Sequence, residues 1–221
     1  MRTNLLIFFA LQCLFHQTAL GQIFSYTTND NGQKLNHRIL MDESYFVETQ
    51  FMMNPNQFVK TIGGFYEKNG EDLEVNLEFN SNFFKDSLKQ ISVKDQHLWK
   101  KVSKNTLPLD GKWLMAGRVK GNQERRRDTS RPRKTMKILI DGYFQWIAFN
   151  TANFSFHGTG GGSYNAANGT YTETIDYFSR DNNKVGISLG FEYEKKGSDW
   201  HHKGFSSKGD PLHEIWSIRT P

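Results

Sequence analysis

Hydrophobic and polar residues alternate along most of this chain, in short aromatic-rich runs that are separated by Gly, Asn and Asp. Alternation with a period of two is typical of strands that bury one face. Residues 171–177 place large side chains at odd positions and small polar ones at even positions, and residues 186–193 repeat the alternation. Turn pairs such as Asn31-Gly32 and Asn168-Gly169 separate the runs and favour tight hairpins. The pattern therefore predicts an all-β fold of antiparallel strands.

The order of apolar, aromatic and glycine positions in residues 39–66 recurs in residues 138–164, about one hundred residues later. We interpret this as two copies of one β-meander, at residues 22–108 and 109–221. The second copy contains about eight strand candidates, enough to close a small up-and-down barrel. The first contains about seven, so we expect an incomplete barrel or one that shares strands with the second copy.

The composition is that of an ordinary globular protein, because 37% of the 221 residues are hydrophobic and 23% are charged. These fractions argue against disorder, collagen and coiled coil. The single cysteine, Cys13, lies in an apolar N-terminal run. A mature chain without it has neither disulfides nor thiolate chemistry.

The N-terminus predicts export. An apolar stretch from Leu5 to Phe15 is followed by the small-residue pattern Ala19-Leu20-Gly21, which is typical of a secretory signal. We expect a signal peptide at residues 1–21, cleaved after Gly21, and a secreted or periplasmic protein. The run is shorter than the roughly 20 residues that cross a bilayer, so no membrane span is predicted.

The formal charge of +5 is concentrated in one segment, Arg118 to Lys137, which holds nine Lys or Arg residues and two acidic ones. We interpret it as a solvated loop. The alternative is an electropositive mouth that attracts an anionic ligand or surface. The segment lacks the interleaved aromatic residues that stack bases, so no nucleic-acid partner is expected.

Several motifs of the second copy occur together in one known group of proteins. They include the runs 144–150, 157–164 and 200–204, with the Gly-Thr-Gly-Gly-Gly and Trp-His-His elements, and the run Glu214-Ile215-Trp216. In this the chain resembles the uncharacterised lipocalin-like (calycin-type) secreted proteins of Gram-negative bacteria. The resemblance implies a barrel, with Trp113 of a Gly-x-Trp motif across its closed end and a basic residue, Arg219, stacked on the indole.

Two polar residues are the main candidates for chemistry inside such a barrel. Glu173 shares a strand face with Tyr171 and Ile175, so it is expected to point inward, where a carboxylate can anchor a ligand or act as a base. His201 and His202 are adjacent on one strand and face opposite ways, and we expect His202 to share the interior with Glu173. The alternative is that both residues are hydrogen-bonded parts of the core.

Aromatic side chains complete the candidate ligand site, which consists of Trp146, Tyr164, Glu173, His202 and Trp216. The histidines and Glu214 match no metal-site spacing, so neither a metal nor a cofactor is expected. Gly158 to Gly162 lacks the following helix and lysine of a phosphate loop, and a bulge where the sheet bends explains it better. No set of the Ser-His-Asp type is recognisable.

These observations favour an exported binding protein for a small apolar or amphipathic ligand held in the second barrel. An enzyme on the same barrel, an isomerase, cyclase or hydrolase with Glu173 and His202 as acid and base, is the first alternative. A structural or interaction protein with filled barrels is the second.

Overall fold

The computed structural model of this protein describes residues 21–102, 105–121 and 123–219. The expected signal peptide lies outside the described residues except for Gly21. Strands account for 67% of the described residues and helices for 5%, which confirms the all-β prediction. No helix of the described part is long and apolar enough to cross a membrane.

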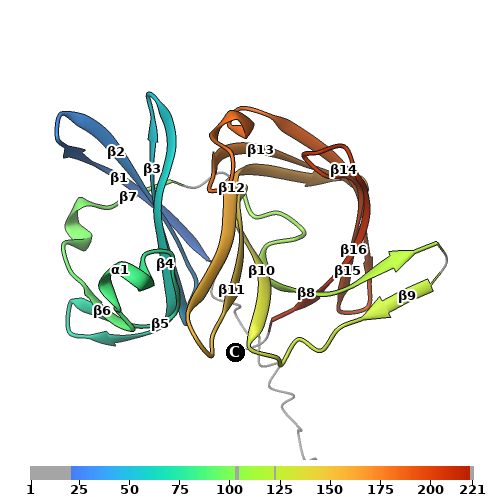
Figure 1. Cartoon of the computed structure of the whole chain (residues 1–221), viewed down its shortest axis with the longest axis horizontal. Coiled ribbons are helices and arrows are strands. Elements are labelled where there is room, and N and C mark those ends of the chain that lie inside the picture. The colour runs from blue at the N-terminus through green and yellow to red at the C-terminus, as the bar shows by residue number, and fades with distance from the viewer. Residues whose placement is uncertain (1–20, 103–104, 122, 220–221) are drawn as a thin grey trace, which may run out of the picture.

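The first half of the chain forms one open, antiparallel, seven-stranded sheet. Its order is β6-β5-β4-β3-β2-β1-β7. Its strands are β1 (Gln22–Asp30), β2 (Gln33–Met41), β3 (Tyr45–Met53), β4 (Asn56–Asn69), β5 (Asp72–Asn80), β6 (Gln90–Val93) and β7 (Lys100–Lys101). A short helix α1 (Phe83–Asp86) and a 3-10 turn η1 (Gln96–Leu98) connect its last strands. In Figure 1 this sheet forms the blue to green half of the molecule.

The second half forms a closed, eight-stranded, antiparallel barrel, as predicted for this copy. Its strands are β8 (Gly111–Lys120), β10 (Arg133–Ile140), β11 (Tyr143–Asn150), β12 (Ser155–Ala167), β13 (Thr170–Phe178), β14 (Ser188–Lys196), β15 (Asp199–Phe205) and β16 (Pro211–Ile218). Pairing of β10 with β8 closes the ring. A 3-10 turn η2 (Asn182–Lys184) lies between β13 and β14, and β9 (Gln123–Arg126) extends from the barrel as a hairpin with β8 (Figure 1).

The two halves share a bulge at equivalent places. The register between neighbouring strands shifts at Gly63 and Gly64 in β4, and at Gly161 and Gly162 in β12. A Cβ atom at Gly162 would fall on the carbonyl oxygen of Thr174 in the adjacent strand, so only glycine allows this close approach. The glycine run is therefore a bend in the barrel wall.

The sheet and the barrel pack face to face through a continuous apolar core. Leu40, Val47 and Phe79 of the sheet meet Ile138 and Phe149 of the barrel in this cluster. The same strands β10 and β11 point their alternate residues into the barrel, so both of their faces are buried. A polar cluster lies beside this apolar core.

Gln145 supplies the polar centre of that interface. Its side-chain amide donates to the hydroxyls of Thr61 and Thr159 at 3.1 and 3.0 Å, and its oxygen accepts from Thr49 at 3.1 Å. All of these groups are buried, so their mutual hydrogen bonds offset the cost of removing them from water. This network aligns β3 and β4 with β11 and β12.

The expected stacking of Arg219 on Trp113 is wrong. Trp113 does lie at one end of the barrel interior, where its indole N–H donates to the Leu109 carbonyl at 2.8 Å. Arg219 points away from it, forms two 2.8 Å hydrogen bonds with Glu78, and lies over the rings of Tyr45 and Phe65. A guanidinium leaving the last strand meets a carboxylate of the first sheet there, and it fastens the barrel to that sheet.

The interpretation of residues 118–137 as a loop is also wrong. The end of β8, all of β9 and the first half of β10 lie in this segment. Paired strands in water tolerate long charged side chains, so a high density of Lys and Arg does not exclude a ribbon. Its last residue, Lys137, is buried inside the barrel.

The bulge in β12 predicts different effects for two glycine substitutions in the barrel. Gly162→Ala is expected to lower the free energy of unfolding by about 1–3 kcal/mol, because the new methyl group collides with the backbone of β13. Gly190→Ala is the matched control, since a Cβ there has no neighbour within 4 Å, and it should stay within about 0.5 kcal/mol of the wild type. Urea unfolding of both variants measures the difference, and equal stabilities would contradict the assignment.

Candidate functional site

The interior of the barrel holds one buried ion pair inside an aromatic shell. Lys137 of β10 and Glu173 of β13 are 5% and 7% exposed, and their Nζ and Oε2 atoms are 3.2 Å apart. Both side chains are there because of strand parity: Met136 and Ile138 face the first sheet, so Lys137 between them faces inward. Charges buried this deeply require partners, and here each of the two residues is the partner of the other.

Four aromatic rings enclose the Lys137 ammonium. Its Nζ lies 5.1 Å from the ring centre of Tyr171, 5.3 Å from Trp200, 5.5 Å from Trp216 and 5.8 Å from Phe144. Ring faces attract a cation, and the attraction is stronger where water is excluded. The shell therefore stabilises the ammonium together with the carboxylate.

Tyr171 connects this shell to the carboxylate. Its hydroxyl donates to Glu173 Oε2 at 3.0 Å, the same oxygen that Lys137 contacts. Burial raises the pKa of Tyr171 well above its usual range, and the Glu173 charge raises it further. The phenol thus stays protonated and serves as a fixed donor.

His202 of β15 lies in the same interior, as expected from its sequence. Its ring is 2% exposed and sits against Phe191, Tyr171 and Trp200, at centre distances of 4.0, 5.2 and 5.0 Å. Burial lowers the pKa of His202 well below its usual range, and the nearby Lys137 charge lowers it further. His202 is therefore neutral at physiological pH.

Three buried polar atoms in this shell have no hydrogen-bond partner among the described residues. They are Nδ1 of His202, Nε1 of Trp200 and Nε1 of Trp216. An unpaired buried donor or acceptor costs roughly 1–3 kcal/mol, so such atoms in a native protein call for an explanation. The first two belong to β15 and the third to the neighbouring strand β16.

A second carboxylate lies between this interior and the surface of the protein. Burial raises the pKa of Glu214 of β16 above its usual value, although the charges of Lys137 and Arg118 oppose the rise. Its Oε1 is 3.5 Å from a guanidinium nitrogen of Arg118, whose side chain is 72% exposed. Arg118 and Glu214 thus mark where the charged interior reaches solvent.

The aligned positions of the first half carry apolar residues in place of this ion pair. The strand registers align Lys137 with Ile39, because Lys137 is paired with Trp146 and Ile39 is paired with Glu48 at the equivalent position of the first half. The registers of the next strand pairs align Glu173 with Val75. Ile39 and Val75 belong to an apolar core. The fold of this repeat therefore forms without the ion pair.

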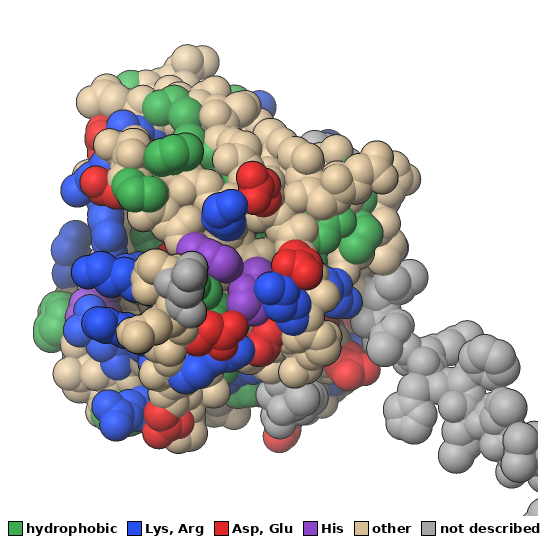
Figure 2. Space-filling model, turned by 90° about the vertical axis from the view of Figure 1, so that its right-hand side faces the viewer, with side chains coloured by type: hydrophobic (Ala, Val, Ile, Leu, Met, Phe, Trp, Pro, Cys, Tyr) green, Lys and Arg blue, Asp and Glu red, His purple; other side chains and the backbone are tan. Residues whose placement is uncertain are grey.

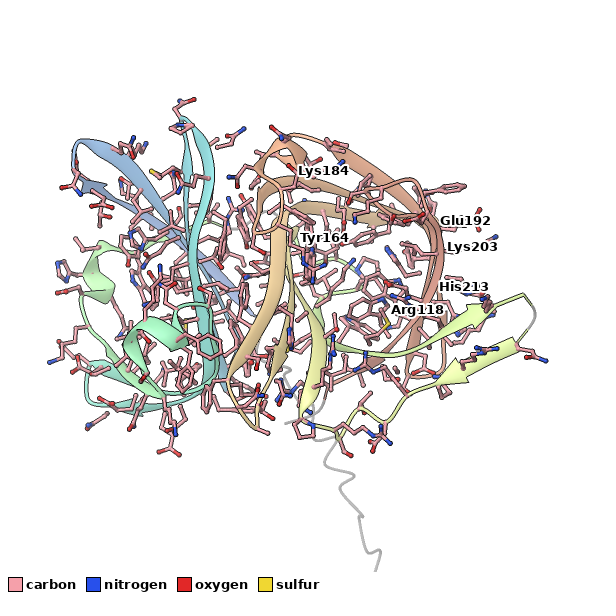
Figure 3. All side chains as sticks on the ribbon, viewed as in Figure 1. Arg118, Tyr164, Lys184, Glu192, Lys203 and His213 are labelled. Carbon is pink, nitrogen blue, oxygen red and sulfur yellow. The ribbon has the colours of Figure 1, made fainter. Side chains whose placement is uncertain are left out.

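The five residues predicted from the sequence occupy different parts of the interior. Glu173, His202 and Trp216 surround Lys137. Tyr164 lies on the inner side of β12 (Figure 3), where its hydroxyl donates to Asp110 near one end of the barrel. Trp146 is half-buried, and Arg180 covers its ring at 5.4 Å.

Lys137, Tyr171 and Glu214 are the site residues that sequence reasoning missed. Lys137 was counted with the basic segment, although the apolar residues Met136, Ile138 and Leu139 beside it signal a buried strand. Tyr171 shares its face with Glu173 in the alternating run, and this signal was available. Glu214 lies before a buried Ile215 and Trp216 on a strand whose facing the sequence alone does not determine.

A shallow cavity of about 430 Å³ lies on the outer face of β14 to β16. Figure 2 shows histidines there among acidic and basic side chains, and Figure 3 labels Glu192, Lys203 and His213 on this side. His201 Nδ1 and His213 Nε2 are 3.1 Å apart and share a hydrogen bond. The described residues hold no group of three or more metal-ligating side chains.

Comparison with known proteins adds no family. No protein-family model matches this sequence, and no curated protein shows significant similarity to it.

The low pKa of His202 predicts a pH dependence of stability. Below about pH 6.5 the unfolded chain binds a proton at this residue and the folded chain does not, so the free energy of unfolding falls as pH decreases. The slope from one such group reaches about 1.4 kcal/mol per pH unit. His202→Leu should remove this contribution, whereas His157→Gln, a change at an exposed histidine, should keep it.

Urea unfolding at pH 7.5, 6.5 and 5.5 tests this expectation. A His202→Leu variant with the same loss of stability on acidification as the wild type would show that His202 is protonated inside the barrel.

Proposed function

We propose that this protein is an exported binding protein, and that the closed barrel of its second half holds a small amphipathic ligand. The single observation that supports this most strongly is the buried Lys137–Glu173 pair, which stands where the first half has Ile39 and Val75. Replacing a buried ion pair by apolar residues is often neutral or stabilising. The first half has apolar residues at these positions and folds with them, so the stability of this repeat does not require the ion pair.

The chemistry around the pair suits a ligand with one polar end. Lys137 offers further N–H donors beyond the one directed at Glu173, and His202 and Trp200 offer polar atoms without partners among the described residues. The surrounding rings of Phe144 and Trp216 suit an apolar body. We assign the polar end of the ligand to Lys137, with orientation by Glu173 and His202, and its apolar body to Trp146 and Trp216.

The basic ribbon at residues 118–137 supports an anionic character of the ligand or of a surface that the protein approaches. Arg118 and the residues of β9 are exposed on the side of the barrel where Glu214 reaches solvent. A positive field at a rim raises the local concentration of anions. We propose that this ribbon directs an anionic head group toward Lys137.

An enzyme on the same barrel is the second candidate, and the two interior carboxylates favour it. Glu214 has a raised pKa next to Lys137, while Glu173 is ion-paired with the same ammonium. Two acidic groups in different environments are a common arrangement for an acid and a base. In that case Glu214 and neutral His202 would exchange protons with a bound substrate.

The test separates ligand binding from folding by installing the residues of the first half. Lys137→Ile combined with Glu173→Val should leave the free energy of unfolding unchanged or raise it by about 1–4 kcal/mol. The same variant should bind the probe 8-anilinonaphthalene-1-sulfonate at least about tenfold more weakly, because a charge-assisted hydrogen bond to the sulfonate contributes about 1.5–3 kcal/mol. Isothermal titration measures the affinity and urea unfolding the stability.

Two controls complete this experiment. Lys137→Met alone should lose about 3–5 kcal/mol of stability, because it leaves the Glu173 carboxylate buried without a cation beside it. Glu192→Gln, on the outer face, should bind the probe like the wild type. Equal affinities of the double variant and the wild type would place binding elsewhere, and a double variant that fails to fold would make the ion pair a structural element.

A further inference from the structure

A chain of three hydrogen-bonded side chains lies on the first sheet, on the face turned away from the barrel. The Thr28 hydroxyl is 2.9 Å from Nε2 of His37, and the Nδ1 of His37 is 2.7 Å from Oε1 of Glu48. The residues come from β1, β2 and β3 at diagonal positions of one sheet face. The order is hydroxyl, imidazole and carboxylate.

The direction of the hydrogen bonds between these three side chains follows from the carboxylate. Hydrogen bonds from His37, Gln50 and Tyr26 lower the pKa of Glu48 below its ordinary value, although burial opposes them. An ionised carboxylate only accepts hydrogen bonds, so Nδ1 of His37 is the donor. In a neutral imidazole Nε2 is then the acceptor, and the Thr28 hydroxyl donates to it.

The imidazole is held firmly and the hydroxyl is accessible. His37 is 6% exposed and stacks on Tyr26, with ring centres 4.1 Å apart and planes at 17°. Thr28 is exposed, near the tip of the β1–β2 hairpin that extends away from the barrel in Figure 1. A rigid base next to an open hydroxyl is the arrangement that activates a nucleophile.

The outer edge of β1 supplies hydrogen-bond donors next to this hydroxyl. Val102 donates its N–H to the Ile23 carbonyl at 2.8 Å, so the odd-numbered residues of β1 face the outer edge. By the same alternation the amides of Thr27 and Asn29 face that edge, beyond the residue pairs that β7 forms with Phe24 and Ser25. Backbone N–H groups are the donors that most often stabilise an oxyanion in acyl transfer.

The aligned positions of the second half do not repeat this hydrogen-bonded arrangement. The strand registers align His37 and Glu48 with Thr135 and Trp146. The repeat therefore folds without this imidazole and this carboxylate, so the shared architecture does not explain them.

We propose that Thr28, His37 and Glu48 form an acyl-transfer site for small, activated esters, separate from the barrel. Thr28 Oγ forms a bond to the ester carbonyl carbon while its proton passes to His37 Nε2. The carbon–oxygen bond to the leaving group then breaks, and the proton leaves with the alcohol. Water, deprotonated by His37, attacks the acyl-threonine, releases the carboxylic acid and restores the hydroxyl. Glu48 is a positioning residue.

The test uses diisopropyl fluorophosphate, which reports the nucleophile by mass. Its phosphorus forms a bond to Thr28 Oγ, fluoride leaves, and the proton passes to His37. We expect one diisopropylphosphoryl group on the wild type, located on Thr28 by tandem mass spectrometry, and none on Thr28→Val. Thr28→Ser should react at least as fast as the wild type, since it keeps the hydroxyl and removes a methyl group.

Two further variants separate a catalytic base from a structural one. His37→Gln should slow modification about a hundredfold or more, the usual contribution of a general base, and Glu48→Gln should slow it at least about tenfold. His157→Gln, the same change at an exposed histidine outside both sites, should react like the wild type. An unmodified Thr28 in the wild type, or equal rates in His37→Gln and the wild type, would overturn the proposal.

Discussion

Strands β10 and β11 are buried on both faces, and the rest of the structure depends on this constraint. Their outward residues, such as Ile138 and Phe149, form the core shared with the first sheet, and their inward residues line the barrel. Residues on a strand alternate strictly between faces, so contact with the first sheet determines which side chains enter the barrel. Lys137 is inside because Met136 and Ile138 are required at the interface.

Once a lysine is inside, the interior must satisfy it. An isolated buried charge is far more costly than a paired one, and Glu173, Tyr171 and the aromatic shell together supply the pairing. The same ammonium helps to keep His202 neutral and opposes the rise in the pKa of Glu214. The interior is therefore one coupled electrostatic unit, in which a change at Lys137 alters the others.

The alternation of the sequence was sufficient to predict the strands, the closed barrel and the inward direction of Glu173 and His202. The alternation did not predict the environment of a side chain where that environment depends on which element packs against its strand. Lys137 belongs to a run rich in Lys and Arg, and its burial depends on a sheet that lies far away in sequence. Arg219 could reach either Trp113 or Glu78, and only the docking of the two halves selects Glu78.

The hydroxyl, imidazole and carboxylate on the first sheet were invisible in the sequence for a different reason. Thr28, His37 and Glu48 belong to three strands, and their contacts depend on the pairing of Tyr26 with His37 and of Ile39 with Glu48. A shift of one residue in either register would turn one of them to the opposite face. The two halves thus share one fold and differ in where they place polar groups.

Ligand binding by the charged interior of the barrel is tested most directly by native mass spectrometry, with the chain purified under non-denaturing conditions from the cells that produce it. If the interior holds a ligand, the wild type is heavier than the bare chain by one small molecule, and the variant that carries Lys137→Ile and Glu173→Val has the bare mass. A bare mass for the wild type, or the same bound molecule on both proteins, would contradict this role of the interior.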